Sequence, residues 1–314
     1  IIGSEFNFNS PKQVKELLYD KMKFPVQYKH KKITTDEAAI NKLMQRYPSE
    51  KVLRLIVSCR KISKLINTFL DMSLIEGKMV TAYNASGTKG ARISSSKTLW
   101  GTGMNLQNIP VGKSKGVENI RNLFVPAKGK IFLNADLVQA ESMVVGELLH
   151  KLGDPTLRNL HQKKDFDIHN WMAAHFLSKP EIEVTKKERE AFGKIPNHSG
   201  NYGAGPIVMV NKAAKEEVEG INFQVAKQLI ATRHRLIPGL KKWWRNVEKQ
   251  LRSTRTLTTP FGRRRIFFGR LDETTFRDAY SFIPQSTVGE VLNMILTKIE
   301  MNVNSKLDIL LQVH

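Results

Sequence analysis

The amino-acid sequence predicts an α+β fold in which helices predominate. Several long segments carry apolar residues at helical spacing, whereas the strand-like segments are short and lie far apart in the chain. The chain has 314 residues, of which 41% are hydrophobic. That is enough for two or more subdomains with a substantial core.

The first third of the chain predicts three helices. Ser10 and Pro11 are typical of a helix start, with Ser10 as the N-cap and Pro11 at the first helical position. The run TTD at 34–36 offers an N-cap for a second helix over 37–46. A third, longer helix is expected to open at 48–49 and to bury one apolar face. That face consists of Val52, Leu55, Ile56, Cys59, Ile62, Leu65, Ile66 and Phe69.

The middle of the chain alternates short strands with helices. A strand over 79–84 and a turn over 87–90 precede an apolar strand at 131–133, which ends shortly before Asp136. We expect that strand to be buried and to open to solvent at Asp136. A helical pattern that includes Glu141 follows, and a Gly-Asp-Pro sequence ends it.

Two further helices are predicted in the middle of the chain. Asp167 opens a helix that runs through Phe176. Another helix follows Lys186 and contains Pro196. Because proline removes a backbone hydrogen bond inside a helix, we expect a kink there.

The last third predicts helices over 222–237 and 240–251, separated by a Pro-Gly pair. A hairpin is predicted over 256–268, a helix over 287–303 and a buried strand over 309–313. The inward face of the last helix is expected to consist of Val288, Val291, Leu292, Ile295, Leu296 and Ile299.

Two groups of side chains in this last third have alternative interpretations. Trp243 and Trp244 could stack on nucleobases, but their place on an amphipathic helix favours core packing. Three consecutive arginines at 263–265 cannot all face one side of a strand. At least one of them is therefore expected to be structural.

The charge of the chain favours a polyanionic partner. Lysine and arginine total 50 against 29 aspartate and glutamate residues, so the formal net charge is +21. The basic residues occur in most segments rather than in one tail, which indicates a long binding surface. A soluble basic protein without such a partner is the plainer alternative.

Cys59 is the single cysteine, which excludes an internal disulfide and a cysteine-based metal site and suits a reducing compartment. No apolar run is long enough to span a bilayer, and no signal-peptide pattern is present at the N-terminus.

Sequence blocks in a fixed order carry the strongest functional signal. The central block is FLNADLVQAESMVVGELL at 132–149. The others are ARISSS (91–96), NLQNIP (105–110), GKIPNHSGNYGAGP (193–206), PFGRRR (260–265), RDAYSFIPQ (277–285) and LLQVH (310–314). Their order and spacing resemble the polymerase module of family A DNA polymerases, from about Phe6 to the last residue.

The resemblance implies a right-hand polymerase architecture with thumb, fingers and an incomplete palm that contains an antiparallel sheet. Residues 1–78 would form the thumb, 79–145 the first part of the palm, 146–284 the fingers and 285–314 the second part of the palm. It also implies template-directed DNA synthesis by transfer of deoxynucleotides to a primer 3′-hydroxyl. The partners would be primer–template DNA and dNTPs, with no membrane. We expect a monomer in the cytoplasm of a bacterial or phage-infected cell.

Two Mg²⁺ ions are implied as cofactors, because two metals about 3.5–4 Å apart clamp the attacking and leaving oxygens in such reactions. Asp136 matches the first metal-binding aspartate of the family, and the backbone carbonyl of Leu137 is a plausible second ligand. In the family a catalytic aspartate follows QVH, whereas this sequence stops at His314. We therefore expect a fragment that binds DNA with little or no synthesis.

The resemblance assigns the nucleotide site to two helices. Lys194 matches the lysine that binds the triphosphate and serves catalysis, and His198 and Tyr202 follow at intervals of four residues on the same face. His169 matches a histidine that reaches the phosphates, although a lone histidine is more often structural. The family has an arginine four residues before the lysine, where this sequence has Glu190. Either a local bulge or the long side chain of Arg189, which we also place in the site, would compensate.

Glu141 bears on the choice of sugar. The matching glutamate of family A DNA polymerases crowds the 2′ position and excludes ribonucleotides, and Gln139 also matches a residue near the nucleotide. The alternative for Glu141 is a solvated acid in the first turn of a helix, where the dipole favours it.

DNA contacts are implied for residues in five of the blocks. Arg92 would touch the primer end, and contacts in the minor groove would check base-pair shape rather than sequence. The implied DNA-binding residues are Arg92, Gln107, Asn108, Arg264, Arg277, Gln285 and His314.

Some positions differ from the family pattern, and two rival functions stay open. Ala91 and Ser286 replace glycine, Val138 replaces serine, and His198 stands where many members have Phe or Tyr. Substitutions such as Ala91, Val138, His198 and Ser199 favour a divergent, phage-type member. A non-catalytic DNA-binding relic shares the basic charge but needs no metal site. A single-subunit RNA polymerase is the other rival, and Glu141 argues against it.

Overall fold

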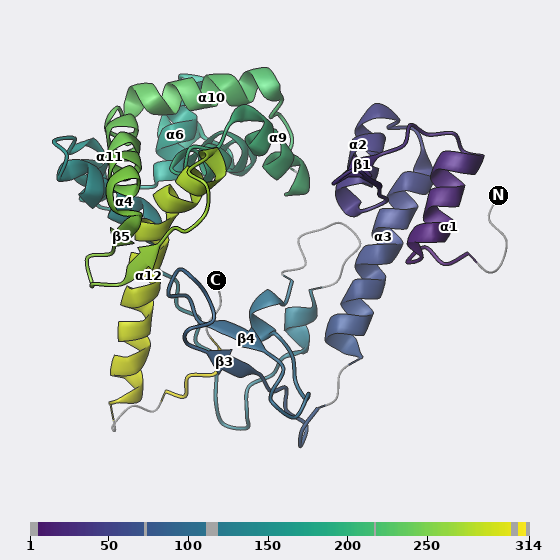
Figure 1. Cartoon of the computed structure of the whole chain (residues 1–314). Helices are drawn as coiled ribbons and strands as arrows, with labels where there is room; N and C mark the ends of the chain where they lie inside the picture. The colour runs from purple at the N-terminus through teal and green to yellow at the C-terminus, as the bar shows by residue number, and fades with distance from the viewer. Residues whose placement is uncertain (1–5, 72–73, 111–118, 217, 303–306, 312–314) are drawn as a thin grey trace. The chain divides into compact units, whose positions relative to one another are not determined.

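The computed structural model describes residues 6–71, 74–110, 119–216, 218–302 and 307–311 (Figure 1). These residues fall into two compact units, one comprising 6–82 with 95–130 and the other 83–94 with 131–311. Each unit has a hydrophobic core of its own. No helix among the described residues is long and apolar enough to cross a membrane.

Three helices form the main core of the first unit. Two of them begin where the sequence predicts: the Ser10 side chain accepts from the N–H of Gln13, and Asp36 accepts from the N–H of Ala39 at 2.9 Å. Both are N-caps that satisfy free backbone donors. The elements of this part of the unit are α1 (Pro11–Lys15), the π-helix η1 (Glu16–Lys21), β1 (Tyr28–Lys29), β2 (Lys32–Ile33), α2 (Glu37–Arg46), α3 (Lys51–Leu65) and the π-helix η2 (Ile66–Leu70).

The start and the buried face of α3 differ from the prediction. The helix begins at Lys51 rather than at 48–49, and its buried residues are Leu53, Ile56 and Val57. Leu55, which we expected inside, is 61% exposed. Packing against α2 decides which stripe is buried, and it selects the one that holds Leu53, Ile56 and Val57.

A smaller cluster of the first unit holds the NLQNIP block. Met104, Leu106, Ile109 and Ile120 form its buried part. The short 3₁₀ helices η3 (Leu106–Asn108) and η4 (Ile120–Leu123) lie in this region.

Helices dominate the second unit, and most begin and end close to the predicted positions. They enclose a core of more than twenty buried residues. The helices are α4 (Ala140–His150), α5 (Thr156–His161), α6 (Ile168–Leu177), η5 (Glu181–Glu183), α7 (Lys186–Glu188), η6 (Arg189–Lys194), α8 (Ile195–Gly200), α9 (Pro206–Lys215), α10 (Phe223–Leu236), α11 (Gly239–Thr254) and α12 (Glu273–Glu300).

Short two-stranded sheets complete the described structure. The predicted hairpin is confirmed: β5 (Thr256–Thr258) pairs antiparallel with β6 (Arg264–Ile266), with Leu257 opposite Arg265. β3 (Ala82–Asn84) and β4 (Ser94–Ser96) form another pair, and β1 pairs with β2.

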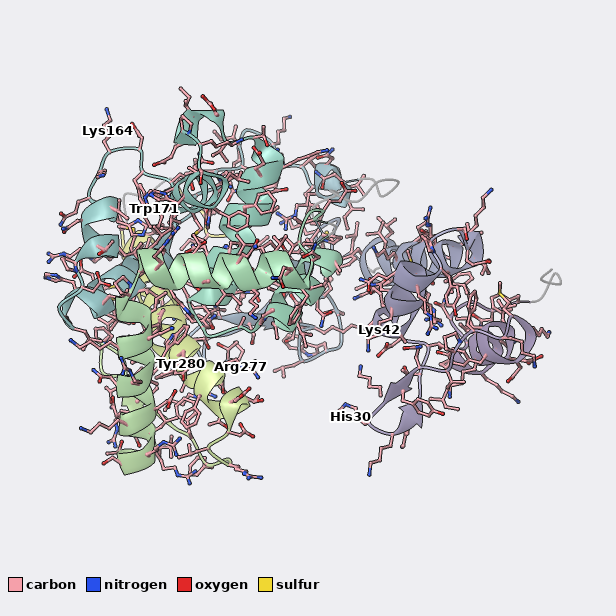
Figure 2. All side chains as sticks on the ribbon, turned by 90° about the horizontal axis from the view of Figure 1, so that it is seen from above. His30, Lys42, Lys164, Trp171, Arg277 and Tyr280 are labelled. Carbon is pink, nitrogen blue, oxygen red and sulfur yellow. The ribbon has the colours of Figure 1, made fainter. Side chains whose placement is uncertain are left out.

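Core packing explains the two adjacent tryptophans. Trp243 is buried, and Trp244 stacks on Tyr280 of α12 with ring centroids 5.4 Å apart. The hydroxyl of Tyr280, which Figure 2 labels, donates to Glu248 of α11. Both tryptophans therefore pack in the contact between α11 and α12, as the core interpretation predicted.

The last long helix begins earlier than predicted. α12 starts at Glu273, with Asp272 as N-cap accepting from the N–H of Thr275 at 2.9 Å, and continues through Pro284 to Glu300. We expected a start at 287. A proline disfavours a helix interior. Pro284 is buried in this unit, so tertiary packing overrides that local preference.

Two predicted strands are absent from the described structure. Residues 131–137 have no regular secondary structure, and Ile131, Phe132 and Leu133 are 87%, 51% and 73% exposed. Residues 307–311 likewise form no strand and are exposed, and the rest of the predicted strand at 309–313 lies outside the described residues. An apolar run becomes a strand only where a neighbouring strand completes its hydrogen bonds. No sheet in the described part of the chain includes either segment.

Candidate functional site

A π-helical turn shapes the helix that carries Lys194. The N–H of Ile195 donates to the carbonyl of Glu190, five residues back, and η6 covers Arg189–Lys194 between α7 and α8. Five residues make about one turn of a π-helix, so Arg189 and Lys194 lie on the same side. Of the two alternatives for the displaced arginine, the structure therefore has the local bulge.

This π-turn also accounts for Pro196. The proline stands in the first turn of α8, directly after η6. The predicted irregularity is present, but it takes the form of a π-turn before the proline. Such turns insert one extra residue into a helix and are frequent at functional sites.

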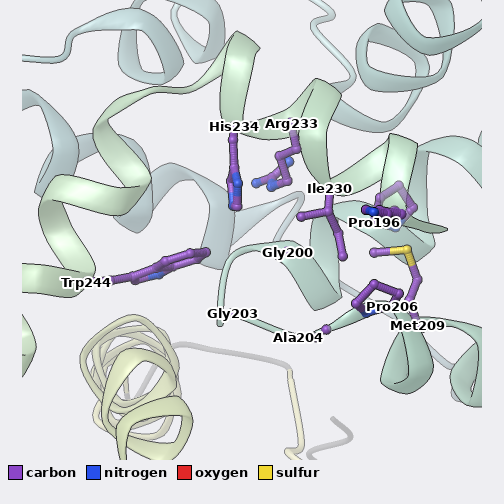
Figure 3. A pocket seen from close by; sticks show the side chains of 12 residues that line it. Pro196, Gly200, Gly203, Ala204, Pro206, Met209, Ile230, Arg233, His234 and Trp244 are labelled. Atoms are coloured by element: carbon purple, nitrogen blue, oxygen red, sulfur yellow. The ribbon is translucent and has the colours of Figure 1, made fainter. Parts of the chain in front are cut away.

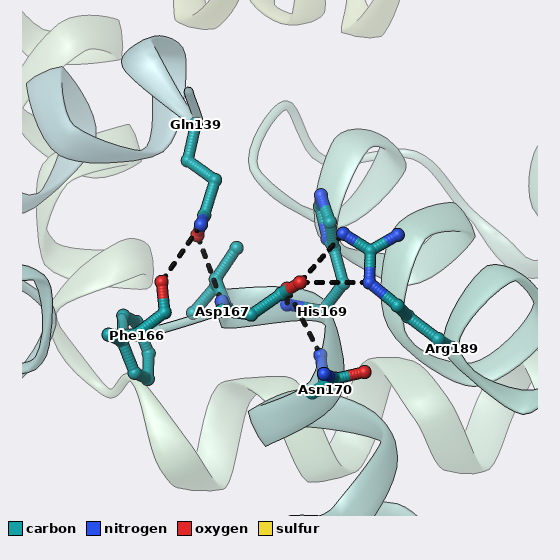
Figure 4. Close-up of polar contacts among 7 residues, drawn as sticks. Gln139, Phe166, Asp167, His169, Asn170 and Arg189 are labelled. Carbon is teal, nitrogen blue, oxygen red and sulfur yellow. Dashed lines mark hydrogen bonds and ion pairs between the residues drawn. The ribbon is translucent and has the colours of Figure 1, made fainter. Parts of the chain in front are cut away.

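Asp167 ties the π-turn to the start of α6. Its Oδ1 accepts from the backbone N–H of His169 at 2.7 Å and of Asn170 at 3.2 Å, and its Oδ2 accepts from Nε and Nη2 of Arg189 at 2.9 and 2.7 Å (Figure 4). Burial raises the pKa of the Asp167 carboxyl, but these hydrogen bonds outweigh it and hold the pKa below its ordinary value. Sequence reasoning recognised Asp167 as a helix start and missed its pairing with Arg189.

Gln139 fastens the same loop from the other side. Its side-chain nitrogen donates to the carbonyl of Phe166, and its oxygen accepts from the N–H of Ile168, both at 2.9 Å. Both ends of the Gln139 amide are thus engaged with the backbone that precedes His169 (Figure 4). In this structure Gln139 positions the loop that carries His169.

His169 and His198 face one another at the centre of this cluster. Their rings lie 5.4 Å apart, and His169 is 7% exposed whereas His198 lies at the surface. Burial, together with His198 and Arg189, lowers the pKa of His169 to about 4. The imidazole is therefore neutral at pH 7 beside several cations.

Lys194 and Lys212 complete the basic side of the cluster. Lys212, on α9, lies close enough to His198, Lys194 and Glu141 to interact with their charges. Burial lowers the pKa of Lys212. Sequence reasoning missed Lys212, because no local pattern on α9 relates it to α8.

Glu141 is held by two residues from distant parts of the chain. Its Oε1 accepts from Nη2 of Arg92 at 2.6 Å, and its Oε2 accepts from the hydroxyl of Tyr202 at 2.5 Å. Burial and the nearby carboxylate raise the pKa of Tyr202, which keeps its proton on the hydroxyl. Glu141 is therefore a positioned carboxylate and not simply a solvated acid at a helix start.

The loop that carries Arg92 is attached to α12. Nδ2 of Asn293 donates to the carbonyl of Ala91 at 3.0 Å, and a Cβ on Gly289 would lie 3.0 Å from the carbonyl oxygen of Gly90. Ala91 has a φ of 60°, in the left-handed region that glycine adopts without strain. The glycine of the resembled family suits this backbone conformation.

Asp136 lies exposed in the irregular segment before α4. Its carboxylate and the carbonyl of Leu137 are hard oxygen donors, which is the donor chemistry that Mg²⁺ prefers. The described residues bring no three histidine, cysteine, aspartate or glutamate side chains together in a metal-binding group. Substrate phosphates and water would have to supply most ligands, as is usual for Mg²⁺.

The predicted DNA-binding residues lie on separate elements. In the second unit, Arg277 and Gln285 stand eight residues apart on α12, which places them on one side of that helix, and Arg264 is exposed on β6. In the first unit, Asn108 is exposed at the end of η3 and Gln107 precedes it. His314 lies outside the described residues.

The other two arginines of the hairpin have structural partners. Arg265 forms an ion pair with Asp278, and its guanidinium group lies over the ring of Phe267. Nε of Arg263 lies 3.6 Å from Oε1 of Glu290. The expectation that at least one of the three arginines is structural is confirmed.

A small cavity of about 240 Å³ lies beside this cluster, between α8, α9 and α10 (Figure 3). On its wall, Arg233 is 0% exposed and its Nη2 donates to Oδ1 of Asn201. Burial lowers the pKa of Arg233 to about 10, which still leaves it charged at pH 7. Gly200 makes room for it, since a Cβ there would lie 2.5 Å from Cδ of Arg233. This arginine was not foreseen from the sequence.

Comparisons with known proteins identify similar sequences and a similar fold. A family model described as DNA polymerase family A matches residues 1–314. DNA polymerase I of Helicobacter pylori is 29% identical over 325 residues, and the thermostable DNA polymerase I of Thermus filiformis is 30% identical over 332 residues. Both alignments cover 100% of this chain but only 34% and 37% of the relatives. The chain thus spans about a third of the length of the curated relatives it matches.

A solved structure shares the fold. It is the polymerase domain of Pol1 from M. smegmatis in complex with DNA primer–template and dNTP, with a TM-score of 0.77 and 23% sequence identity. The match covers 96% of this chain and 52% of that chain.

Proposed function

Since the chain belongs to DNA polymerase family A, we propose that the protein containing it transfers deoxynucleotides to a primer 3′-hydroxyl under the direction of a template. The observation that carries this proposal is the single cluster formed by α4, α6 and the π-turn. It places the fixed carboxylate of Glu141 and the side chains of Arg189, Lys194 and His169 in one unit.

The basic side of the cluster would bind the triphosphate. Phosphoryl transfer needs positioning and charge stabilisation more than covalent chemistry from the protein. Lys194 and Arg189 supply positive charge, and Asp167 holds Arg189 in place. His169 supplies a neutral imidazole whose Nδ1 has no hydrogen-bond partner among the described residues. His198, exposed on the same helix, would lie against the incoming base.

Asp136 and the carbonyl of Leu137 would hold Mg²⁺. When bound, the metal neutralises developing charge on the phosphate oxygens, and we propose the two-metal form of this chemistry. Asp136 would contribute the carboxylate on its exposed segment, and the substrate phosphates would provide further oxygens.

Glu141 would select the sugar. Its two hydrogen bonds leave the carboxylate few alternative positions, which is what a steric barrier to a 2′-hydroxyl requires. Arg92 and Tyr202 would act as positioning residues for this barrier.

We further propose that 1–78 serves as the thumb, 79–145 and 285–314 as parts of the palm and 146–284 as the fingers. DNA would contact Arg92, Gln107, Asn108, Arg264, Arg277 and Gln285. The net charge of +21 supports a polyanionic partner.

A primer-extension assay with Mg²⁺ tests the proposal. The protein containing this chain is expected to extend a primer with dNTPs, and Asp136→Ala is expected to lose activity by about a thousandfold, since the loss of a metal-binding carboxylate removes several kcal/mol of transition-state stabilisation. Asp71→Ala, another exposed aspartate in an irregular segment, is the matched control and should retain activity. Equal activity of Asp136→Ala and the wild type would sink the proposal.

A non-catalytic DNA-binding function is the second candidate. It is favoured because the described residues bring no group of three potential metal-binding side chains together. Mg²⁺-dependent binding of dNTPs by the wild type, lost in Lys194→Ala, separates the two, because DNA binding alone needs neither. Incorporation of rNTPs in preference to dNTPs would instead indicate an RNA polymerase.

A further inference from the structure

The loop between the ARISSS and NLQNIP blocks presents two apolar side chains to solvent. Leu99 is 98% exposed and Trp100 is 85% exposed. Of the other tryptophans, Trp171 and Trp243 are buried and Trp244 stacks on Tyr280. The exposure of Trp100 is therefore specific to this loop.

Hydrogen bonds fix the loop in a tight turn. The N–H of Gly101 donates to the carbonyl of Thr98 at 3.0 Å, so Leu99 and Trp100 occupy the two central positions of a β-turn. The N–H of Thr98 donates to the carbonyl of Thr102 at 2.9 Å, and the two threonine hydroxyls lie 2.6 Å apart.

The base of the loop is attached to the segment before β3. The N–H of Met104 donates to the carbonyl of Val80 at 3.1 Å, and the hydroxyl of Thr81 donates to the carbonyl of Ser96 at 3.1 Å. Gly103 has a φ of 72°, and a Cβ there would lie 2.2 Å from the carbonyl oxygen of Val80, so only glycine fits. The tip is thus held in place before any partner binds.

Charge indicates the chemical class of the partner. No aspartate or glutamate occurs between Glu76 and Glu118, whereas that stretch contains Lys78, Lys89, Arg92, Lys97, Lys113 and Lys115. Lys97 directly precedes the turn. An aromatic side chain beside lysine and without acidic neighbours suits a nucleic acid, since bases stack on aromatic rings while cations pair with phosphates.

We infer that the Leu99–Trp100 tip is a DNA-binding element in which Trp100 stacks on a nucleobase and Leu99 packs against the neighbouring sugar or base. The inference rests on the proposed function for its partner but adds a contact outside the nucleotide cluster. A rigid turn loses little conformational freedom on binding. Little of the favourable stacking free energy is therefore offset by ordering of the loop, and the affinity for DNA is higher.

Fluorescence anisotropy with a labelled primer–template tests the inference. Trp100→Ala is expected to raise the Kd about tenfold, which corresponds to about 1.4 kcal/mol, and Leu99→Ala to raise it about threefold. Trp100→Phe keeps an aromatic face and should recover most of the affinity. Ile182→Ala is the matched control, because Ile182 is 95% exposed on another element and should leave the Kd unchanged.

Two further readouts distinguish stacking from a general loss of charge. The slope of log affinity against log salt should be the same for Trp100→Ala and the wild type, because no phosphate contact is removed. Acrylamide quenching of the tryptophan fluorescence should fall when DNA is added to the wild type, and this decrease should be absent in Trp100→Phe. The inference is overturned if the wild type binds DNA and Trp100→Ala binds it equally well, an outcome that leaves the proposed function standing. Absence of salt-sensitive DNA binding by the wild type would overturn both.

Discussion

The hydrogen bond from Tyr202 to Glu141 helps to hold the Glu141 carboxylate in position. Tyr202→Phe removes the hydroxyl that donates to Oε2 of Glu141 at 2.5 Å. We expect discrimination against ribonucleotides to fall about five- to tenfold, because the carboxylate then has a single fixing partner, Arg92. The measurement is the ratio of kcat/KM for a dNTP and the matching rNTP.

Tyr280→Phe is the control for this experiment, since its hydroxyl also donates to a glutamate, Glu248, at another place in the same unit. Both variants are expected to lower the free energy of unfolding by about 1 kcal/mol. Only Tyr202→Phe should change sugar discrimination, and equal effects of the two would contradict the proposed role of Glu141.

His169 makes the stability of the protein depend on pH. Its pKa in the folded state is about 4, below the ordinary value of about 6.5, so the unfolded chain takes up a proton first as the pH falls. The stabilisation is complete above pH 6.5 and is lost as the pH falls toward 4. Each unit of pKa difference corresponds to about 1.4 kcal/mol, so the loss is expected to reach about 2–3 kcal/mol.

Urea unfolding of the wild type and His169→Gln between pH 7 and 4.5 measures this effect. The variant should lose about 1–2 kcal/mol less over that range, because glutamine does not titrate. His161 and His234, whose pKa values are also lowered, are present in both proteins and cancel in the difference, whereas His198 interacts with His169 and contributes to it. Identical pH dependence of the two would refute the prediction.

At the scale of elements, Asp154 connects two helix starts. Its Oδ1 accepts from the N–H of Thr156 at 3.0 Å, and its Oδ2 accepts from the N–H of Gly239, the first residue of α11, at 2.7 Å. Asp154→Ala leaves both donors without this acceptor and is expected to lower the free energy of unfolding by about 1–3 kcal/mol. Asp20→Ala, at an exposed position, should change it by less than about 0.5 kcal/mol. Thermal or urea unfolding measures the free energy of unfolding of both variants. A change for Asp154→Ala as small as that for Asp20→Ala would contradict the stabilising role of Asp154.

The boundaries of elements agree with the sequence-based predictions where they depend on residues only a few positions away. They differ from the predictions where they depend on packing against a distant segment of the chain. Ser10, Asp36 and Asp167 are N-caps in the structure, because a cap bonds backbone groups only two or three residues away. The apolar runs at 131–133 and 309–313 predicted strands, but a strand needs a second strand at the right distance. The helix predicted over 287–303 begins earlier, at Glu273, because the packing of α12 outweighs the local cost of Pro284.

At the scale of the whole molecule, the net charge predicts how DNA binding responds to salt. With +21 formal charges over 314 residues, we expect log affinity to fall linearly with log salt. If the protein neutralises six or more phosphates, its affinity for DNA should fall about a thousandfold between 50 and 200 mM salt.

Arg277→Gln provides an internal comparison for the salt experiment. This substitution removes one positive charge that contacts a phosphate or a groove of the DNA. The slope of log affinity against log salt should therefore become smaller in magnitude by about one. An affinity that does not change with salt would contradict a DNA-binding surface built on these basic residues.

By itself, the sequence determined the helix-rich fold class, most helix starts and the family, because these depend on spacing within short segments and on the order of the blocks. It left open whether Arg189 replaces the arginine expected at 190. Only the tertiary structure decided that a π-turn aligns Arg189 with Lys194, that Asp167 holds this arginine, and that Arg92 and Tyr202 fix Glu141. These contacts join residues 22 to 61 positions apart. Their partners are selected by packing and burial, which no local pattern encodes.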